Sequence, residues 1–379
     1  MHKQVDRMVA PVMLAVLVAL LTASCGGAAT TAPASAAAPA SAAAPAATTV
    51  PASAAAPAAT TVPASAAAPA SAAAPASGAP ASTTALKVAL VTPSAVNDLA
   101  FSESMVNALD SLKTQYNLQI AISDNQFVVS TAANVLRSYA AQGYNLVIAH
   151  GSQYGSIIQQ LAPQFPNVSF AWGTAGSTFN QPNVFAYQAN SNEGGYVQGA
   201  MAALLSKTGV LGVIGPIAVG DAKLYVDGFC AGAKSVTPSI SCIPVYTGSF
   251  SDVSLMATAA RTFVANKADV LTGTAQAVVG AIGVARSDNL PWFGTQWTQV
   301  SLAPSNVVSS QIYNWAPTLE QIITEIRGGK LGGATYTLTL GNGGEQIQFN
   351  PGFNLPASVK AKADSLIKGI TEGTVNVPQ

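Results

Sequence analysis

Charged side chains are scarce in this sequence. Asp, Glu, Lys and Arg make up 8% of the 379 residues, and the formal net charge is zero. About a quarter of residues are charged in a typical globular domain. The composition excludes three classes of protein: a basic nucleic-acid binder, an acidic disordered chain and a polybasic protein of the membrane surface. We therefore predict that the chain has no nucleic-acid partner.

Histidine and cysteine are almost absent as well. The chain has two histidines, His2 and His150, and three cysteines. Structural and catalytic zinc sites are built from several such residues close together. We therefore predict no metal site and no cofactor.

The motifs of several enzyme classes are also missing. The sequence has no GxxxxGK[ST] phosphate loop, no GxGxxG after a strand, no HExxH helix and no GxSxG turn. A nucleophilic triad needs a base, and His150 is the only candidate once His2 has been removed with an export signal. Because Asp98, Glu193 and Asp221 are isolated in the sequence, no pair of carboxylates stands out. We predict that the protein is not an enzyme.

The shortage of charged residues is most marked near the start of the chain. No charged residue occurs from Met8 to Leu86, and the run from Met8 to Leu21 is apolar. This run is shorter than the roughly 20 residues that cross a bilayer, and it suits the core of a signal peptide. The small residues before Cys25 resemble the lipobox of bacterial lipoproteins. We predict a leader over 1–24 and acylation of Cys25, which would anchor the protein on the extracytoplasmic face of the cell membrane. The alternative is an ordinary signal peptide with an incidental cysteine.

A low-complexity segment follows over residues 25–84. The unit PASAAAPAATTV occurs twice in tandem, at 39–50 and 51–62. Proline at this frequency removes backbone donors and prevents helix propagation. The segment therefore predicts an extended, semi-rigid and disordered tether.

Apolar strand-like runs alternate with amphipathic helical stretches from residue 85 onward. This alternation predicts an α/β fold of parallel sheets covered by helices on both faces. The length favours two Rossmann-like lobes with a cleft between them. The runs read as strands are 86–92, 145–150, 168–173, 209–215, 268–273 and 291–294.

Ligands of such folds bind at the carboxyl ends of the strands. Polar and aromatic side chains gather at the predicted strand ends, and we take them as candidate ligand contacts. These candidates are Asp98, Phe101, Tyr154, Trp172, Asp221, Thr274 and Trp297.

Two cysteines remain in the globular part. Cys230 lies on a predicted helix, and Cys242 lies at the start of the next strand. In an exported protein such a pair favours a disulfide, and two buried thiols are the alternative.

A series of short motifs then appears in a fixed order. The segments Gly212–Pro216 and Asp227–Gly232 are similar to GxxGGxPxPxxxxxxxGFxAG, and Asn192–Gly199 is similar to EGxYxAG. Through these segments, the chain resembles the basic membrane protein (Bmp) family of ABC-transporter substrate-binding lipoproteins. The remaining matches are Asn97–Phe101, Phe165–Phe170, Tyr313–Pro317 and Gln348–Pro351.

The resemblance implies a type I periplasmic-binding-protein fold that closes on a small ligand. The expected lobes are 85–189 with 306–330, and 190–305 with 331–379. By position, Phe101 and Trp315 match aromatic residues of the family, Asp98 matches a neighbouring polar contact, and purine nucleosides or nucleobases are the expected ligands. The segment 294–299 lacks the acidic residue that would hold a ribose, so a free base is favoured.

The resemblance also implies partners. We expect a monomer that delivers a neutral, purine-like ligand to an ABC permease and its ATPase. Two alternatives remain open: a binding protein for another neutral solute such as a sugar, and a ligand sensor that takes no part in import.

Overall fold

The structure is a computed structural model that describes residues 84–379. The predicted leader, Cys25 and all but the last residue of the predicted tether lie outside the described residues. In the described part, no helix is long and apolar enough to cross a membrane.

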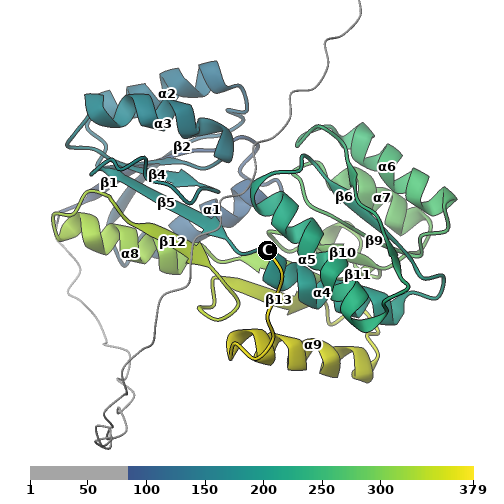
Figure 1. Cartoon of the computed structure of the whole chain (residues 1–379). Helices are drawn as coiled ribbons and strands as arrows, with labels where there is room; N and C mark the ends of the chain where they lie inside the picture. Colours follow the sequence, from purple (N-terminus) through teal and green to yellow (C-terminus); the bar gives the residue numbers. More distant parts are fainter. Residues whose placement is uncertain (1–83) are drawn as a thin grey trace, which may run out of the picture. The chain divides into compact units, whose positions relative to one another are not determined.

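The described residues form two sheets, each covered by helices on both faces, as predicted (Figure 1). The first sheet has the order β12-β5-β4-β3-β1-β2, and all of its pairs are parallel. Its strands are β1 (Leu86–Val91), β2 (Leu118–Ser123), β3 (Leu146–Ala149), β4 (Ser169–Gly173), β5 (Val184–Ala189) and β12 (Thr335–Leu338).

The second sheet repeats this order as β13-β11-β10-β9-β6-β7, and β8 also pairs with β6. Its pairs are parallel except for β13, which runs antiparallel to β11. The strands are β6 (Val210–Gly215), β7 (Ser241–Cys242), β8 (Val245–Tyr246), β9 (Val270–Gly273), β10 (Trp292–Gly294), β11 (Val307–Tyr313) and β13 (Glu345–Phe349).

Strands such as β1 and β3 are almost entirely apolar because both of their faces are buried. In β1, Val88 and Leu90 point into one core, whereas Ala89 and Val91 point into the core on the opposite face. This alternation is the reason that parallel strands read as continuous apolar runs. The helices over the first sheet are α1 (Phe101–Leu112), α2 (Val129–Ala141), α3 (Gly155–Leu161) and α8 (Ala316–Arg327).

Two helices of the second lobe pack through glycines. A Cβ atom at Gly199 would lie 1.8 Å from the carbonyl oxygen of Phe229, and one at Gly232 would lie 1.9 Å from that of Tyr196. Only glycine permits this approach of one backbone to the other. The glycine motifs seen in the sequence therefore serve helix packing here. The helices of this lobe are α4 (Asn192–Leu205), α5 (Gly220–Val236), α6 (Val253–Ala265), α7 (Val279–Ser287) and α9 (Ala357–Thr371).

The sheets differ from the expected lobe boundaries at two strands. Residues 306–330 were expected in the first lobe, but β11 pairs with β10 and β13 in the second sheet. Residues 331–379 were expected in the second lobe, but β12 pairs with β5 in the first sheet. Hydrogen-bonded neighbours decide which sheet a strand joins, and for β12 that neighbour, β5, is distant in the sequence.

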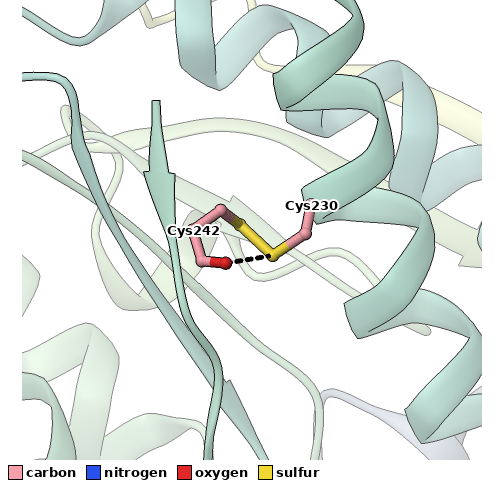
Figure 2. The surroundings of a disulfide bond; sticks show 2 residues. All are labelled: Cys230 and Cys242. Atoms are coloured by element: carbon pink, nitrogen blue, oxygen red, sulfur yellow. Dashed lines mark hydrogen bonds between the residues drawn. A yellow bond between two sulfur atoms is a disulfide. The ribbon is translucent and has the colours of Figure 1, made fainter. Parts of the chain in front are cut away.

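The two cysteines of the globular part form a disulfide (Figure 2). Cys230 lies on α5 and Cys242 on β7, and their sulfur atoms are bonded across a separation of 12 residues. The bridge links α5 to β7, the edge strand of the second sheet.

Candidate ligand-binding cleft

A cavity lies where the carboxyl ends of the strands of both sheets meet. Its position matches the rule for open α/β sheets. The first lobe contributes the loops after β1, β2, β3 and β4. The second lobe contributes the loops after β6, β8, β9 and β10. The lining residues are Pro93, Phe101, Phe127, Gly151, Ser152, Gln153, Thr174, Pro216, Val219, Asp221, Ala222, Phe250, Thr274, Ala275, Gln276 and Gln296.

Phe101 is held in place by a buried histidine. The Phe101 ring stacks on His150, with centroids 3.8 Å apart and planes 5° from parallel. His150 Nε2 lies 3.1 Å from the carbonyl oxygen of Phe101, and Nδ1 lies 2.8 Å from the hydroxyl of Tyr187. Because a carbonyl only accepts, Nε2 carries the proton, and Nδ1 accepts from Tyr187. The imidazole thus fixes one face of the Phe101 ring.

Burial keeps His150 neutral. The ring is fully buried, and this loss of hydration lowers its pKa from 6.5 to about 3, although the hydrogen bond to Phe101 acts in the opposite direction. A neutral imidazole with both nitrogens paired is a structural support and not a general base at physiological pH.

The lowered pKa of His150 should make the protein sensitive to acid. Below pH 6.5 the unfolded chain takes up a proton that the folded chain does not bind until about pH 3, so stability falls as pH falls through this window. Each unit is worth about 1.4 kcal/mol, so lowering the pH from 6.5 to 5 should lower the free energy of unfolding by about 2 kcal/mol. His150→Gln keeps a donor and an acceptor and should lose less stability over this range. Urea unfolding at the two pH values checks this, and equal losses for both proteins would contradict it.

Two further rings meet across the cavity. Phe127 comes from the loop before α2 and Phe250 from the loop before α6, and their centroids are 6.3 Å apart at 53°. Both line the cavity, and Phe127 is 45% exposed. Together with Phe101 they give the cavity three aromatic surfaces.

The second lobe supplies a carboxylate and several polar side chains to the cavity. Asp221 lies in the first turn of α5, where the helix N-terminus favours a negative charge. The hydroxyl of Tyr313 lies 3.3 Å from Asp221 Oδ2 and donates to it. Burial raises the pKa of Asp221, whereas this hydrogen bond and one from Gln296 lower it. Thr274, which follows β9, is buried and also lines the cavity.

Three of the eight candidate contacts therefore line the cavity: Phe101, Asp221 and Thr274. Asp98 lies just outside it and caps helix α1. Its carboxylate accepts hydrogen bonds from the backbone N–H groups of Ala100, Ser102 and Glu103 and from the Ser94 hydroxyl. The isolated Asp98 is explained by this capping.

The other four candidates, all aromatic, also lie outside the cavity lining. Tyr154 is fully buried and donates to the carbonyl of Gln126, 2.9 Å away. Trp315 is fully buried in the core of the first lobe. Trp172 stacks on Phe179, and Trp297 lies in a separate groove beside α1 and β13.

The sequence analysis missed several lining residues. Phe127 and Phe250 follow strands that the apolar pattern did not resolve, since β2 is half-buried and β8 is short. Gln276 follows the strand read at 268–273, but only its neighbour Thr274 was chosen as a candidate. Gln153 and Gln296 lie within strand-end segments that were noted, but nothing in the pattern distinguished them from their neighbours. No cluster of His, Cys, Asp or Glu within residues 84–379 could hold a metal ion.

Comparisons with known proteins agree with this geometry. The family model for ABC transporter substrate-binding proteins of the PnrA-like type (Bmp) matches residues 85–378. The chain is 26% identical over 245 residues to a purine-binding protein of Brucella abortus, covering 65% of this chain and 69% of that one. It is 28% identical over 319 residues to the ABC transporter nucleoside-binding protein BmpA of Lactococcus lactis, covering 78% and 90%.

A solved structure is similar over the same region. The ABC transporter solute-binding protein of Conexibacter woesei superposes with a TM-score of 0.65 at 25% identity, covering 77% of this chain and 98% of that one.

Proposed function

The chain belongs to the Bmp family of PnrA-like ABC transporter substrate-binding proteins, and from this premise we propose that its cleft captures a purine nucleobase. As a substrate-binding protein, it binds a small molecule outside the cytoplasm and works with a permease and an ATPase. Such proteins are not enzymes.

The observation that carries the purine proposal is the ring of Phe101. One face lies on His150, and the residue lines the cavity, where we propose that the ring stacks on a planar ligand. Stacking of an aromatic side chain on a base is worth about 1–3 kcal/mol. Phe127 and Phe250 add further aromatic surface to the cavity lining.

The charge of the cavity supports a neutral ligand. Among residues 84–379, Asp221 is the one ionisable side chain in the lining, and no Lys, Arg or His of this part lines the cavity with it. An anionic ligand such as a nucleotide would find no counter-charge there. The segment 294–299 contributes Gln296 and no carboxylate to the cavity, so a base fits better than a nucleoside whose ribose needs an acidic partner.

The proposal includes a lipid anchor. We propose that residues 1–24 are an export signal, that Cys25 is acylated and that the segment up to residue 84 tethers the binding domain to the membrane. Mass spectrometry of the mature N-terminus checks this, and an unmodified Cys25 in the native host would contradict it.

A thermal-shift screen tests the ligand class. The domain from residue 85 onward should be stabilised by nucleobases, less by nucleosides and not by sugars. A ligand at 100 times its dissociation constant stabilises the folded state by about 2.7 kcal/mol, which is readily measured. Stabilisation by sugars alone would contradict the purine proposal and favour a carrier of another neutral solute.

Phe101→Leu should weaken nucleobase binding about tenfold or more, because it removes the stacking ring and keeps an apolar side chain. Leucine is the better replacement because Phe101 is 3% exposed and also part of the core, so alanine would destabilise the fold. Isothermal titration calorimetry measures the affinity. The matched control is Phe179→Leu, which changes a ring outside the cavity and should leave binding unchanged. Equal affinities of both variants for the base would contradict a stacking role for Phe101.

A further inference from the structure

Two amide oxygens at the cavity have no hydrogen-bond partner. Within the described residues, Oε1 of Gln276 and Oε1 of Gln296 are both buried and unpaired. Both residues line the cavity, and Gln296 is only 5% exposed. Buried acceptors are almost always paired in native structures, so an unpaired acceptor needs an explanation. Two such atoms in one cavity point to hydrogen-bond donors that a ligand brings.

The neighbourhood of Gln296 fixes which end of its amide faces the cavity. Its side chain makes a hydrogen bond with the Asp221 carboxylate. This hydrogen bond lowers the pKa of Asp221, as a donor to its carboxylate does, so the amide nitrogen of Gln296 is the atom that donates. The amide oxygen is therefore the atom left to meet a ligand.

The backbone of Gln296 holds this arrangement. Gln296 has a φ of +69°, a left-handed conformation that is uncommon for residues other than glycine. Its carbonyl oxygen accepts from the backbone N–H of Tyr313, 3.1 Å away, and the Tyr313 hydroxyl donates to Asp221. Backbone strain of this kind persists where the surrounding structure over-determines it, often at ligand sites.

The polar side of the cavity consequently offers acceptors. Gln276 and Gln296 come from loops of the second lobe and Asp221 comes from the first turn of α5, whereas Phe101 and Phe127 come from the first lobe. We propose that Gln276, Gln296 and Asp221 form an acceptor wall that selects ligands by ring N–H donors, with Gln296 as the residue that sets this specificity. The inference rests on the proposed function, and it narrows the nucleobase to one whose edge nitrogens carry hydrogen.

Methylated bases test this directly. Hypoxanthine has a ring N–H at N1, which a methyl group removes in 1-methylhypoxanthine without changing the charge or the ring. Wild-type protein should bind the methylated base at least about tenfold more weakly. In Gln296→Met, which keeps the length of the side chain and removes the amide, hypoxanthine should bind about tenfold more weakly, and the methylation penalty should shrink to less than about threefold.

This double comparison separates the acceptor from steric effects. A methyl group that merely collides with the wall would cause the same penalty in wild type and in Gln296→Met, and that result would overturn the inference. Gln346→Met, which changes an exposed glutamine on β13 outside this cavity, should behave like wild type. Affinities are measured by isothermal titration calorimetry on the domain from residue 85 onward.

The outcomes also distinguish this inference from the proposed function. If the protein binds purines but Gln296→Met does not change the loss of affinity caused by methylation, the proposed function stands and the acceptor wall is wrong. If no nucleobase binds the wild-type protein, the proposed function fails and the inference fails with it. Xanthine and its 1,3,7-trimethyl derivative provide a second pair, because the latter has no N–H donor on its ring.

Discussion

Replacing Gly199 with alanine should lower the free energy of unfolding by about 3 kcal/mol or more. The added Cβ would lie 1.8 Å from the carbonyl oxygen of Phe229, and this neighbour is backbone, which cannot rotate away. Helices α4 and α5 must then separate, losing packing along their whole contact. Because α5 carries Asp221 in its first turn, the same change should also weaken ligand binding.

Gly283→Ala is the matched control for this substitution. Gly283 also lies within a helix, α7, but a Cβ there meets no atom within 4 Å. Alanine in a helix interior is favoured over glycine by roughly 0.5–1 kcal/mol, so this variant should be slightly more stable than wild type. Urea unfolding of the three proteins gives the comparison. A Gly199→Ala protein as stable as wild type would show that the α4–α5 contact does not require glycine.

Trp315→Ala should cost about 3–5 kcal/mol of unfolding free energy, the usual loss for a large buried aromatic. The indole is fully buried and packs edge-to-face with His150, Tyr187 and Tyr313, at centroid distances of 5.6, 5.1 and 5.5 Å. Its Nε1 donates to the Ser104 hydroxyl at 3.0 Å, so the variant also leaves a buried hydroxyl with one partner fewer.

The Trp315 variant separates a core residue from a ligand contact. Trp297→Ala serves as the control, because Trp297 is half-buried and should cost much less stability. Thermal unfolding without ligand and calorimetric titration with a nucleobase are measured for both. A Trp315→Ala protein that melts like wild type but no longer binds the base would contradict the assignment of Trp315 to the core.

The sequence did not reveal which aromatic side chains line the cavity and which lie in the core. Phe101, Tyr154 and Trp315 all follow strands or begin helices, and the sequence made each a candidate contact. The structure places Phe101 in the cavity lining and Tyr154 and Trp315 in the core. Loops after parallel strands converge at one edge, but whether a ring turns into the cavity or under the sheet depends on the space that distant side chains leave. Trp315, for example, fills the space beside Tyr187, more than a hundred residues away.

The glycine motifs illustrate the opposite case. Their presence in order identified the family from the sequence, although their physical role could not be seen there. In the structure, glycines from EGGYVQG on α4 and from DGFCAG on α5 face one another at backbone contact. The need for glycine arises from a contact between two helices, and a single helix pattern does not reveal it.

By itself, the sequence determined the α/β class and the family, and it set the charge-free stretch from Met8 to Leu86 apart from the rest of the chain. These follow from local features: alternation of apolar runs, proline spacing, short motifs and the distribution of charge. Only the tertiary structure decided that β11 and β12 join opposite sheets from those expected, and that Gln276 and Gln296 present unpaired acceptors to the cavity. Strand pairing and burial depend on contacts between residues far apart in the chain, so neither property can be predicted from a single segment.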